Sequence, residues 1–221
     1  MTNQRKKLLV GLGMIVALSG NAFAQSSTGS LTGWSVFGDV VSQTGAITLT
    51  TARLDGAEDQ ASNLSMQAAV AIAELESAAG VAAYALDLSP EEYGFEGSLI
   101  SQSFAAAAGD TLSFDWSFDT LESFFEDRAF VVIDGEVITL ATSSAPDGAS
   151  QTFSHQVGAA GTLTLSFGVI DTVDYLGVSS LSIGKLQLTP VTAPTPEPGT
   201  YALLLSGLAA IGGSSRRRTG R

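Results

Sequence analysis

One segment alternates apolar and polar residues without a break, and it constrains the fold more than any other feature of the chain. Residues 112–119 read Leu-Ser-Phe-Asp-Trp-Ser-Phe-Asp, with a large apolar group at every even position. Successive side chains of a β-strand point to opposite faces, so this pattern predicts a strand with one buried and one exposed face. Residues 163–169 repeat the same alternation.

Turn signals and further alternation predict more strands. Asp134-Gly135 lies between two apolar runs, at residues 129–133 and 136–140, and is a strong signal for a β-hairpin. The apolar phase of the last predicted strand shifts at Gly184, which indicates a β-bulge. Further strands are predicted at 34–40, 46–51, 98–105, 151–157 and 179–188.

One stretch is compatible with both a strand and a helix. Residues 64–72 alternate as a strand does, whereas apolar residues recur at helical spacing over residues 71–79. Alanine, glutamate and leucine favour a helix, and Gly80 is suited to end one. We therefore expect a short strand or loop that passes into a helix near residues 69–79.

Eight or more short strands with Gly/Asp turns predict an all-β fold: a two-sheet antiparallel β-sandwich, jelly-roll-like, with a short helical insertion. Residues 97–104 (Gly-Ser-Leu-Ile-Ser-Gln-Ser-Phe), 109–116, 129–135 and 163–171 resemble galactose-binding-type jelly rolls. Related modules often end in an Asp-Asn-Val strand. Here that stretch is Gly184-Lys185-Leu186, so the resemblance does not carry a ligand contact over to this chain.

The N-terminus has the three parts of a secretory signal peptide. Basic residues 5–7 precede an apolar segment at residues 8–18, and Ala22-Phe23-Ala24 is a small-x-small cleavage site. An uncleaved N-terminal anchor is the alternative, but the short apolar segment and the cleavage site with Ala22 and Ala24 favour removal of residues 1–24.

The C-terminus combines a rigid polar motif, a short apolar segment and a basic end. Residues 191–199 form a Pro-rich linker that contains the motif Pro196, Glu197 and Pro198. Residues 200–215 are predicted to form a transmembrane helix of roughly 24 Å, shorter than the roughly 30 Å of a hydrocarbon core. The basic tail, residues 216–221, is expected to stay in the cytoplasm, which puts the linker on the outer face. Its topological stop consists of Arg216, Arg217 and Arg218.

Residues 196–218 resemble the PEP-CTERM sorting signal of Gram-negative bacteria that make extracellular polysaccharide. The resemblance implies that exosortase, an integral-membrane cysteine protease, recognises the Pro-Glu-Pro motif and processes the tail. The precursor would lie transiently in the inner membrane, and the product would reach the cell envelope or the extracellular matrix of a biofilm. Galactose-binding-like modules recur ahead of this signal, as they would here.

The segment between the two termini, residues 25–190, is long enough for one domain with a sizeable core. It has no cysteine, so it folds without disulfides although it is exported. It contains 3 basic and 21 acidic residues, a formal net charge of −18. Such a surface repels nucleic acid and anionic lipid, and we expect no nucleic-acid partner. The charge alone favours a generic acidic exterior over a dedicated cation site.

The inventory of catalytic residues is small. His155 is the one histidine and lies between apolar residues of a predicted strand, which favours a structural role at the core or at an edge. There is no cysteine nucleophile and no Gly-x-Ser-x-Gly elbow, and a single histidine argues against a zinc site. A pair of carboxylates is the remaining route to catalysis, as in a glycosidase.

Carboxylates and exposed aromatic side chains are also candidates for ligand binding. A calcium site is predicted in the loop that follows the strand at residues 112–119, with oxygen ligands from Asp119, Glu122, Glu126 and Asp127. The aromatic residues that could stack on sugar rings are Trp34, Trp116, Tyr84, Tyr93 and Tyr175. Both tryptophans are expected to pack in the core, whereas Tyr93 and Phe95 lie among glutamates and are the better exposed candidates.

The sequence therefore predicts an exported, non-catalytic envelope or extracellular-matrix protein that is sorted through its C-terminal signal. Its candidate ligands are carbohydrate, such as an extracellular polysaccharide, and calcium. The alternative is a secreted polysaccharide-active hydrolase that uses paired carboxylates.

Overall fold

The computed structural model describes residues 29–43, 45–122, 124–144, 151–174, 176–191 and 206. The chain divides into two units, Met1–Thr189 and Pro190–Arg221. The predicted signal peptide with Ala22 and Ala24, the Pro-Glu-Pro motif and the basic tail lie outside the described residues, and of the predicted transmembrane helix only Ser206 is described. No helix among the described residues combines the length and the apolar character needed to cross a membrane.

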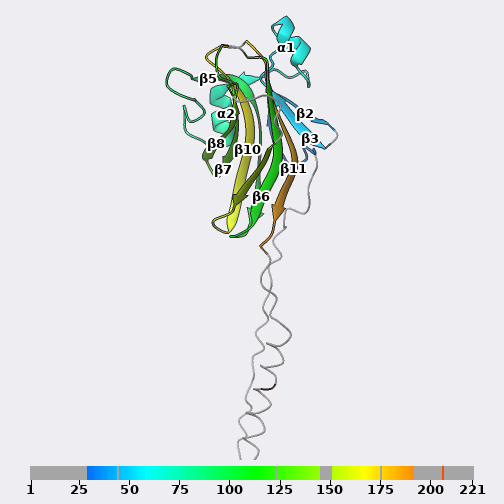
Figure 1. Cartoon of the computed structure of the whole chain (residues 1–221), viewed down its shortest axis with the longest axis vertical. Coiled ribbons are helices and arrows are strands. Elements are labelled where there is room, and N and C mark those ends of the chain that lie inside the picture. Colours follow the sequence, from blue (N-terminus) through cyan, green and yellow to red (C-terminus); the bar gives the residue numbers. More distant parts are fainter. Residues whose placement is uncertain are drawn as a thin grey trace, which may run out of the picture. The chain divides into compact units, whose positions relative to one another are not determined.

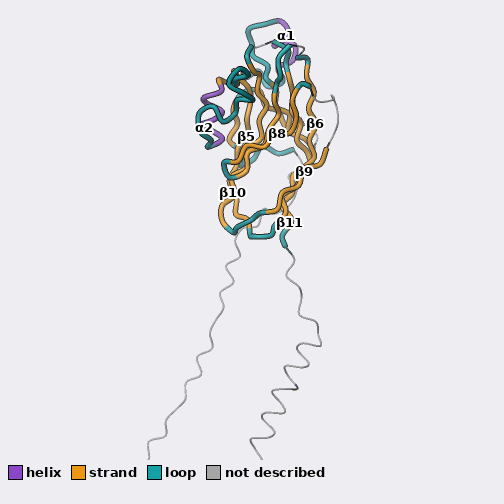
Figure 2. Tube along the Cα trace, turned by 60° about the vertical axis from the view of Figure 1, so that its left-hand side comes forward, coloured by secondary structure: helices purple, strands orange, loops and turns teal. Residues whose placement is uncertain are grey.

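The first unit contains two antiparallel sheets packed face to face (Figures 1 and 2). In the first sheet the order is β1-β5-β10-β7-β8, and the short strand β4 pairs with β5. The bounds of these strands are β1 Ser35–Phe37, β4 Val70–Ala71, β5 Gly94–Ala106, β7 Arg128–Ile133, β8 Glu136–Thr142 and β10 Gly161–Thr172.

The second sheet has the order β2-β3-β11-β6-β9. From β5 onward the chain passes repeatedly between the sheets, since β5, β7, β8 and β10 belong to the first sheet and β6, β9 and β11 to the second. This confirms the predicted β-sandwich of jelly-roll-like topology. The bounds are β2 Asp39–Gln43, β3 Ala46–Thr50, β6 Thr111–Thr120, β9 Gln151–Gln156 and β11 Ser179–Thr189.

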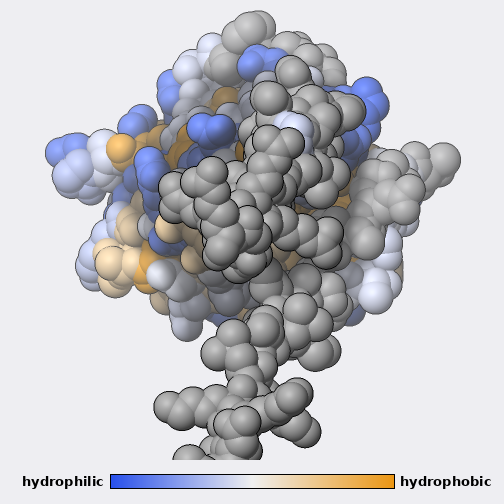
Figure 3. Space-filling view, turned by 90° about the horizontal axis from the view of Figure 1, so that it is seen from below, coloured by the Kyte–Doolittle hydropathy of each residue, from blue (hydrophilic) through white to orange (hydrophobic). Residues whose placement is uncertain are grey.

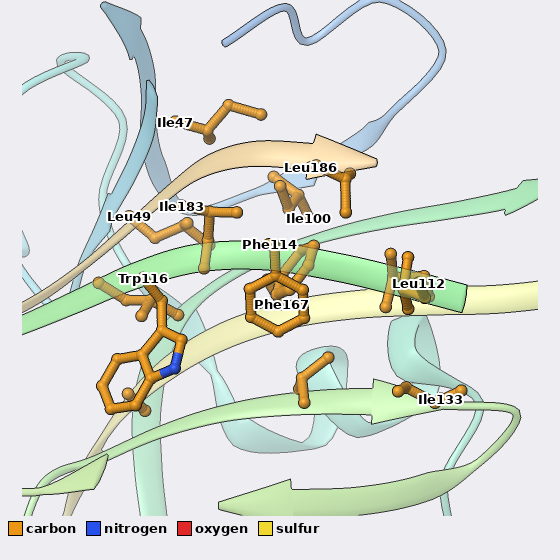
Figure 4. Packing of buried hydrophobic residues seen from close by; sticks show 14 of the residues in the cluster. Ile47, Leu49, Ile100, Leu112, Phe114, Trp116, Ile133, Phe167, Ile183 and Leu186 are labelled. Atoms are coloured by element: carbon orange, nitrogen blue, oxygen red, sulfur yellow. The ribbon is translucent and has the colours of Figure 1, made fainter. Parts of the chain in front are cut away.

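Most of the buried apolar side chains lie between the two sheets. Phe167 on β10 is fully buried, and its ring meets Phe114 of the opposite sheet edge-on at 4.7 Å between centroids (Figure 4). Trp34 packs on the same ring at 5.9 Å, and Trp116 is also buried in this cluster. Both tryptophans are therefore core residues, as the sequence predicted.

A second apolar cluster lies on the outer face of the first sheet, beneath helix α2 (Ile72–Ala79). Leu75 of the helix packs there with Phe130 and Val132 of β7, whereas Val131 belongs to the cluster between the sheets. Because the helix covers this face, β7 is buried on both sides and reads as a continuous apolar run, without alternation.

The outer surface is mainly hydrophilic where it can be seen. In Figure 3, hydrophilic side chains cover most of the described surface on that face, and hydrophobic areas are small. This agrees with the acidic composition of residues 25–190 and with the placement of the large apolar groups in two internal clusters.

The turn signals of the sequence are confirmed. Asp134 and Gly135 both have positive φ and join β7 to β8 as the predicted hairpin. The pairing of β11 with β6 shifts between Gly184 and Gln187, which is the predicted bulge. Helix α2 ends at Gly80, whose φ is 70°.

Two features differ from the expectations. The strand predicted at residues 34–40 is two strands, β1 in one sheet and β2 in the other, separated by Gly38. Gly38 has a φ of 80°, and a Cβ there would lie 2.4 Å from Ser98 Oγ. A second helix, α1 (Ala57–Ser62), was not predicted, because Ala-Glu-Asp-Gln-Ala-Ser has no apolar stripe to indicate it.

Candidate functional site

Two chain segments meet at one end of the sandwich: the connection from β6 to β7 (residues 121–127) and the segment from the end of β10 to the start of β11 (residues 171–178). Leu121 N donates to the carbonyl of Val178 at 3.1 Å, and Thr172 Oγ1 donates to the carbonyl of Glu126 at 2.6 Å. These contacts bring together acidic residues that lie some fifty positions apart in the sequence.

The strand register of the first sheet places three acidic residues, Glu96, Asp127 and Asp171, at neighbouring positions. Asp171 on β10 pairs with Glu96 on β5. On its other side, Ile170 pairs with Arg128, so the antiparallel register puts Asp171 beside Asp127, which directly precedes β7. Asp127 is fully buried, Asp171 is 2 % exposed and Glu96 is 5 % exposed. Acidic side chains are rarely buried so completely unless they have compensating partners.

Two further carboxylates complete this acidic cluster, which we define as Glu122, Asp127, Asp171 and Asp174. Glu122, Asp171 and Asp174 each place one carboxylate oxygen within 4.8 Å of the other two. Gly177 makes this approach feasible, since a Cβ at its position would lie 2.6 Å from Glu122 Cα.

Burial and mutual repulsion oppose ionisation in this region. Burial raises the pKa of Asp127, and burial together with the negative charge of Asp127 raises the pKa of Asp171. Burial also raises the pKa of Glu96 to about 7, although Arg53 counteracts the shift. The cluster therefore favours either a bound proton or a bound cation over free carboxylates.

The hydrogen bonds made within the protein do not satisfy these buried groups. Asp127 Oδ2 accepts from Ser179 Oγ, and the carboxyl groups of Asp127 and Asp171 lie within hydrogen-bonding reach of each other. When both groups are ionised neither can donate, and Asp127 Oδ1 and Asp171 Oδ1 are then buried without a hydrogen-bond donor. The basic side chains of the described residues are engaged elsewhere. Arg53 pairs with Glu96 at 2.8 Å, Arg128 donates to the carbonyl of Leu86 at 3.1 Å, and Lys185 pairs with Asp115 at 2.8 Å.

The structure brings together only two of the four residues that the sequence predicted as calcium ligands. Glu122 and Asp127 belong to the acidic cluster. Asp119 is exposed on β6, where it lines a separate hollow of about 290 Å³ with Thr120 and Ser180. Glu126 contributes its carbonyl to the Thr172 hydrogen bond described above. Asp171 and Asp174 were not in the predicted set, because only the pairing of β10 with β7 brings Asp171 beside Asp127, and Asp174 three residues later joins the same cluster.

The one histidine has the position that the sequence favoured. His155 is half-buried on β9, which lies at the edge of the second sheet and pairs with β6. In that register His155 is opposite Leu112, a core residue. Its neighbours are thus those of a structural side chain at a sheet edge.

A second candidate site is an open hollow of about 570 Å³ in the connection between α2 and β5. Tyr84 and Tyr93 lie on its wall and are 81 % and 46 % exposed. Phe95, which the sequence grouped with Tyr93, does not line it. The other residues that line this tyrosine hollow are Asp87, Ser89 and Pro90.

Comparison with protein families gives a match at the C-terminus. Residues 194–218 match the PEP-CTERM protein-sorting motif, which confirms the assignment made from the sequence. The match covers the tail and does not extend into the sandwich. No curated protein matches the sequence.

Comparison with solved structures gives similar chains of low sequence identity. One, described as "CBM4 structure and function", is 8 % identical with a TM-score of 0.35, and the alignment covers 76 % of this chain and 96 % of the other. Another contains CBM22-1 and GH10 modules of an endo-1,4-β-D-xylanase 10B from Clostridium thermocellum, complexed with xylohexaose. It is 12 % identical with a TM-score of 0.26, and the alignment covers 76 % of this chain but only 29 % of the other.

Proposed function

We propose that this chain, which carries a PEP-CTERM protein-sorting motif at residues 194–218, is a non-catalytic protein of the cell envelope or extracellular matrix. The motif match is the observation that carries the proposal. It implies that the protein is exported, that it passes through the membrane and that exosortase is its sorting partner. We further propose that the protein ends in the envelope or matrix, that it catalyses no reaction and that its sandwich binds a ligand.

The chemistry of the tail supports a transient stay in the membrane. An apolar segment of residues 200–215 spans roughly 24 Å as a helix, less than a typical hydrocarbon core of roughly 30 Å. The arginines at 216–218 hold its end on the cytoplasmic side. The prolines at 196 and 198 keep the outer motif extended, a shape that fits a protease cleft.

The inventory of side chains in the sandwich supports a non-catalytic role over the hydrolase alternative. The described residues contain one histidine, which lies at a sheet edge opposite a core leucine. The buried carboxylates of the acidic cluster are beneath a loop connection and repel one another, whereas a glycosidase needs one ionised carboxylate facing a sugar.

Replacement of Pro196, Glu197 and Pro198 together by alanine is expected to abolish processing, so that uncut precursor accumulates in the membrane fraction. The physical reason is that the extended Pro-Glu-Pro segment is the part of the tail presented outside the membrane for cleavage. Immunoblots of membrane and external fractions from the native host measure the ratio of precursor to product.

The matched control replaces Val191 and Thr192 by alanine, which alters the same linker ahead of the motif and is expected to leave processing intact. Normal processing of the Pro-Glu-Pro variant would refute the proposed route.

The tyrosine hollow favours carbohydrate as the ligand of the sandwich. Two exposed phenol rings beside Asp87 and Ser89 supply apolar faces and polar atoms, the combination that sugar rings require. The formal net charge of −18 over residues 25–190 disfavours acidic polymers, so we propose a neutral polysaccharide.

Tyr84→Ala and Tyr93→Ala are each expected to weaken binding of a neutral polysaccharide at least about tenfold, as is typical when an aromatic contact residue is removed. Affinity gel electrophoresis against a panel of neutral and acidic polysaccharides measures the change. Phe95→Ala, outside the hollow, serves as the control and should bind as the wild type does. Equal retardation of all four proteins would remove the hollow from consideration.

A further inference from the structure

We propose that Glu122, Asp127, Asp171 and Asp174 form a calcium site, which ties the β6–β7 connection to the segment between β10 and β11. This goes beyond the sorting route and the tyrosine hollow, and it stands independently of both. It also differs in composition from the set predicted from the sequence, since Asp119 and Glu126 are replaced by Asp171 and Asp174.

The spacing of the oxygens suits one calcium ion. Calcium binds oxygen at about 2.3–2.6 Å, so two ligands of one ion lie at most about 5 Å apart. The three carboxylate oxygens of Glu122, Asp171 and Asp174 lie within 4.8 Å of one another. They come from two separate segments, so a shared ion would join those segments directly.

Two buried carboxyl groups at this cluster provide support that is independent of the spacing. Asp171, 2 % exposed, belongs to the group of three, and Asp127, fully buried, lies beside it in the strand register. The two carboxyl groups face each other, and while both are ionised Oδ1 of each has no hydrogen-bond donor within the protein. A buried carboxylate oxygen without a partner carries a large desolvation penalty, and a divalent cation would offset it for both residues at once.

No basic side chain of the described residues supplies that compensation. Arg53 is paired with Glu96 and Asp55, Arg128 with backbone carbonyls, and Lys185 with Asp115 on the other sheet. These are the three basic residues of segment 25–190. The negative charge of Asp127 and Asp171 is therefore not balanced by a salt bridge.

The four carboxylate ligands favour calcium over the other common divalent ions. All four groups are carboxylates, and zinc and copper prefer nitrogen and sulfur ligands. Magnesium retains most of its water and requires near-ideal octahedral geometry, whereas calcium accepts an irregular set of six to eight oxygens. Extracellular modules bind calcium with a Kd of about 0.1–1 mM, which suits an exported protein.

Titration calorimetry and thermal unfolding of the full chain in mild detergent test the site. Addition of calcium chloride is expected to give a single binding event and, at a calcium concentration of 100 times Kd, to raise Tm by about 5–10 °C. Asp171→Asn is expected to weaken binding at least about tenfold, because it removes one of the negative charges that hold the ion.

Two more variants separate ligand loss from misfolding or general charge effects. Asp174→Asn alters a half-buried position that folding tolerates readily, and should also reduce the calcium response. Asp119→Asn removes the same charge from a nearby exposed position and should keep the wild-type response. In chelator, Asp171→Asn should melt no lower than the wild type, since it removes a buried repulsion.

A calcium-dependent rise in Tm that is lost in Asp171→Asn and Asp174→Asn but kept in Asp119→Asn would support the site. The absence of a calcium effect in the wild type, a response to magnesium alone, or equal responses in all three variants would overturn it.

Discussion

Phe167→Ala is expected to lower the free energy of unfolding by about 3–5 kcal/mol, the range for removal of a fully buried phenylalanine ring. Phe167 lies at the centre of the cluster between the sheets and contacts Phe114 at 4.7 Å and Trp34 at 5.9 Å between ring centroids. Its removal leaves a cavity that neither sheet can close, because β10 is paired with β5 and β7 on both sides. Urea unfolding of the full chain in detergent, followed by tryptophan fluorescence, measures the loss.

Phe124→Ala is the matched control for that prediction. Phe124 is 86 % exposed, so the same truncation there should change the free energy of unfolding by less than about 0.5 kcal/mol. Similar losses in the two variants would mean that Phe167 is not in the core and that the arrangement of the sheets is wrong.

Asp39→Ala is the second prediction of a large effect, a loss of at least about 3 kcal/mol. Asp39 is fully buried at the start of β2, and its carboxylate holds the loop after α1. Removal leaves the buried Thr50 hydroxyl without an acceptor, at about 1–3 kcal/mol, and breaks three hydrogen bonds from part-buried donors to a charged group. The donors are Ser65 N at 2.7 Å, Ser65 Oγ at 2.6 Å, Leu64 N at 2.9 Å and Thr50 Oγ1 at 2.5 Å.

Limited proteolysis and urea unfolding distinguish this effect from a general loss of charge. The loop at residues 63–67 should become sensitive to protease in Asp39→Ala. Asp55→Ala, which removes a 60 %-exposed carboxylate paired with Arg53, should leave both stability and protease resistance nearly unchanged. An intact loop in Asp39→Ala would contradict the anchoring role of its carboxylate.

Local periodicity explains which parts of the fold were predictable. The alternation over residues 112–119 fixes β6, and Asp134-Gly135 fixes the β7–β8 hairpin, because both signals depend only on neighbouring residues. The division of the predicted strand 34–40 into β1 and β2 at Gly38 was not predictable from the apolar pattern, since apolar residues continue on both sides of Gly38. It depends on the close approach of Ser98, sixty positions away.

The same distinction applies to the candidate sites. Glu122 and Asp127 were predicted from their place in one loop. Asp171 joins them only through the pairing of β10 with β7, a contact between segments far apart in the chain. Tyr84 and Tyr93 were both among the aromatic residues considered for sugar stacking, but the hollow that they share was not predictable, because it arises from the path of the chain between α2 and β5.

We propose that exosortase recognises the Pro-Glu-Pro motif and removes the tail of the exported chain. Mass spectrometry of the protein isolated from the envelope and external fractions of the native host tests this most directly. We expect a C-terminal peptide that ends close to residues 196–198, and none that contains Arg216–Arg218. Recovery of a mature protein that still extends through Arg221 would contradict it.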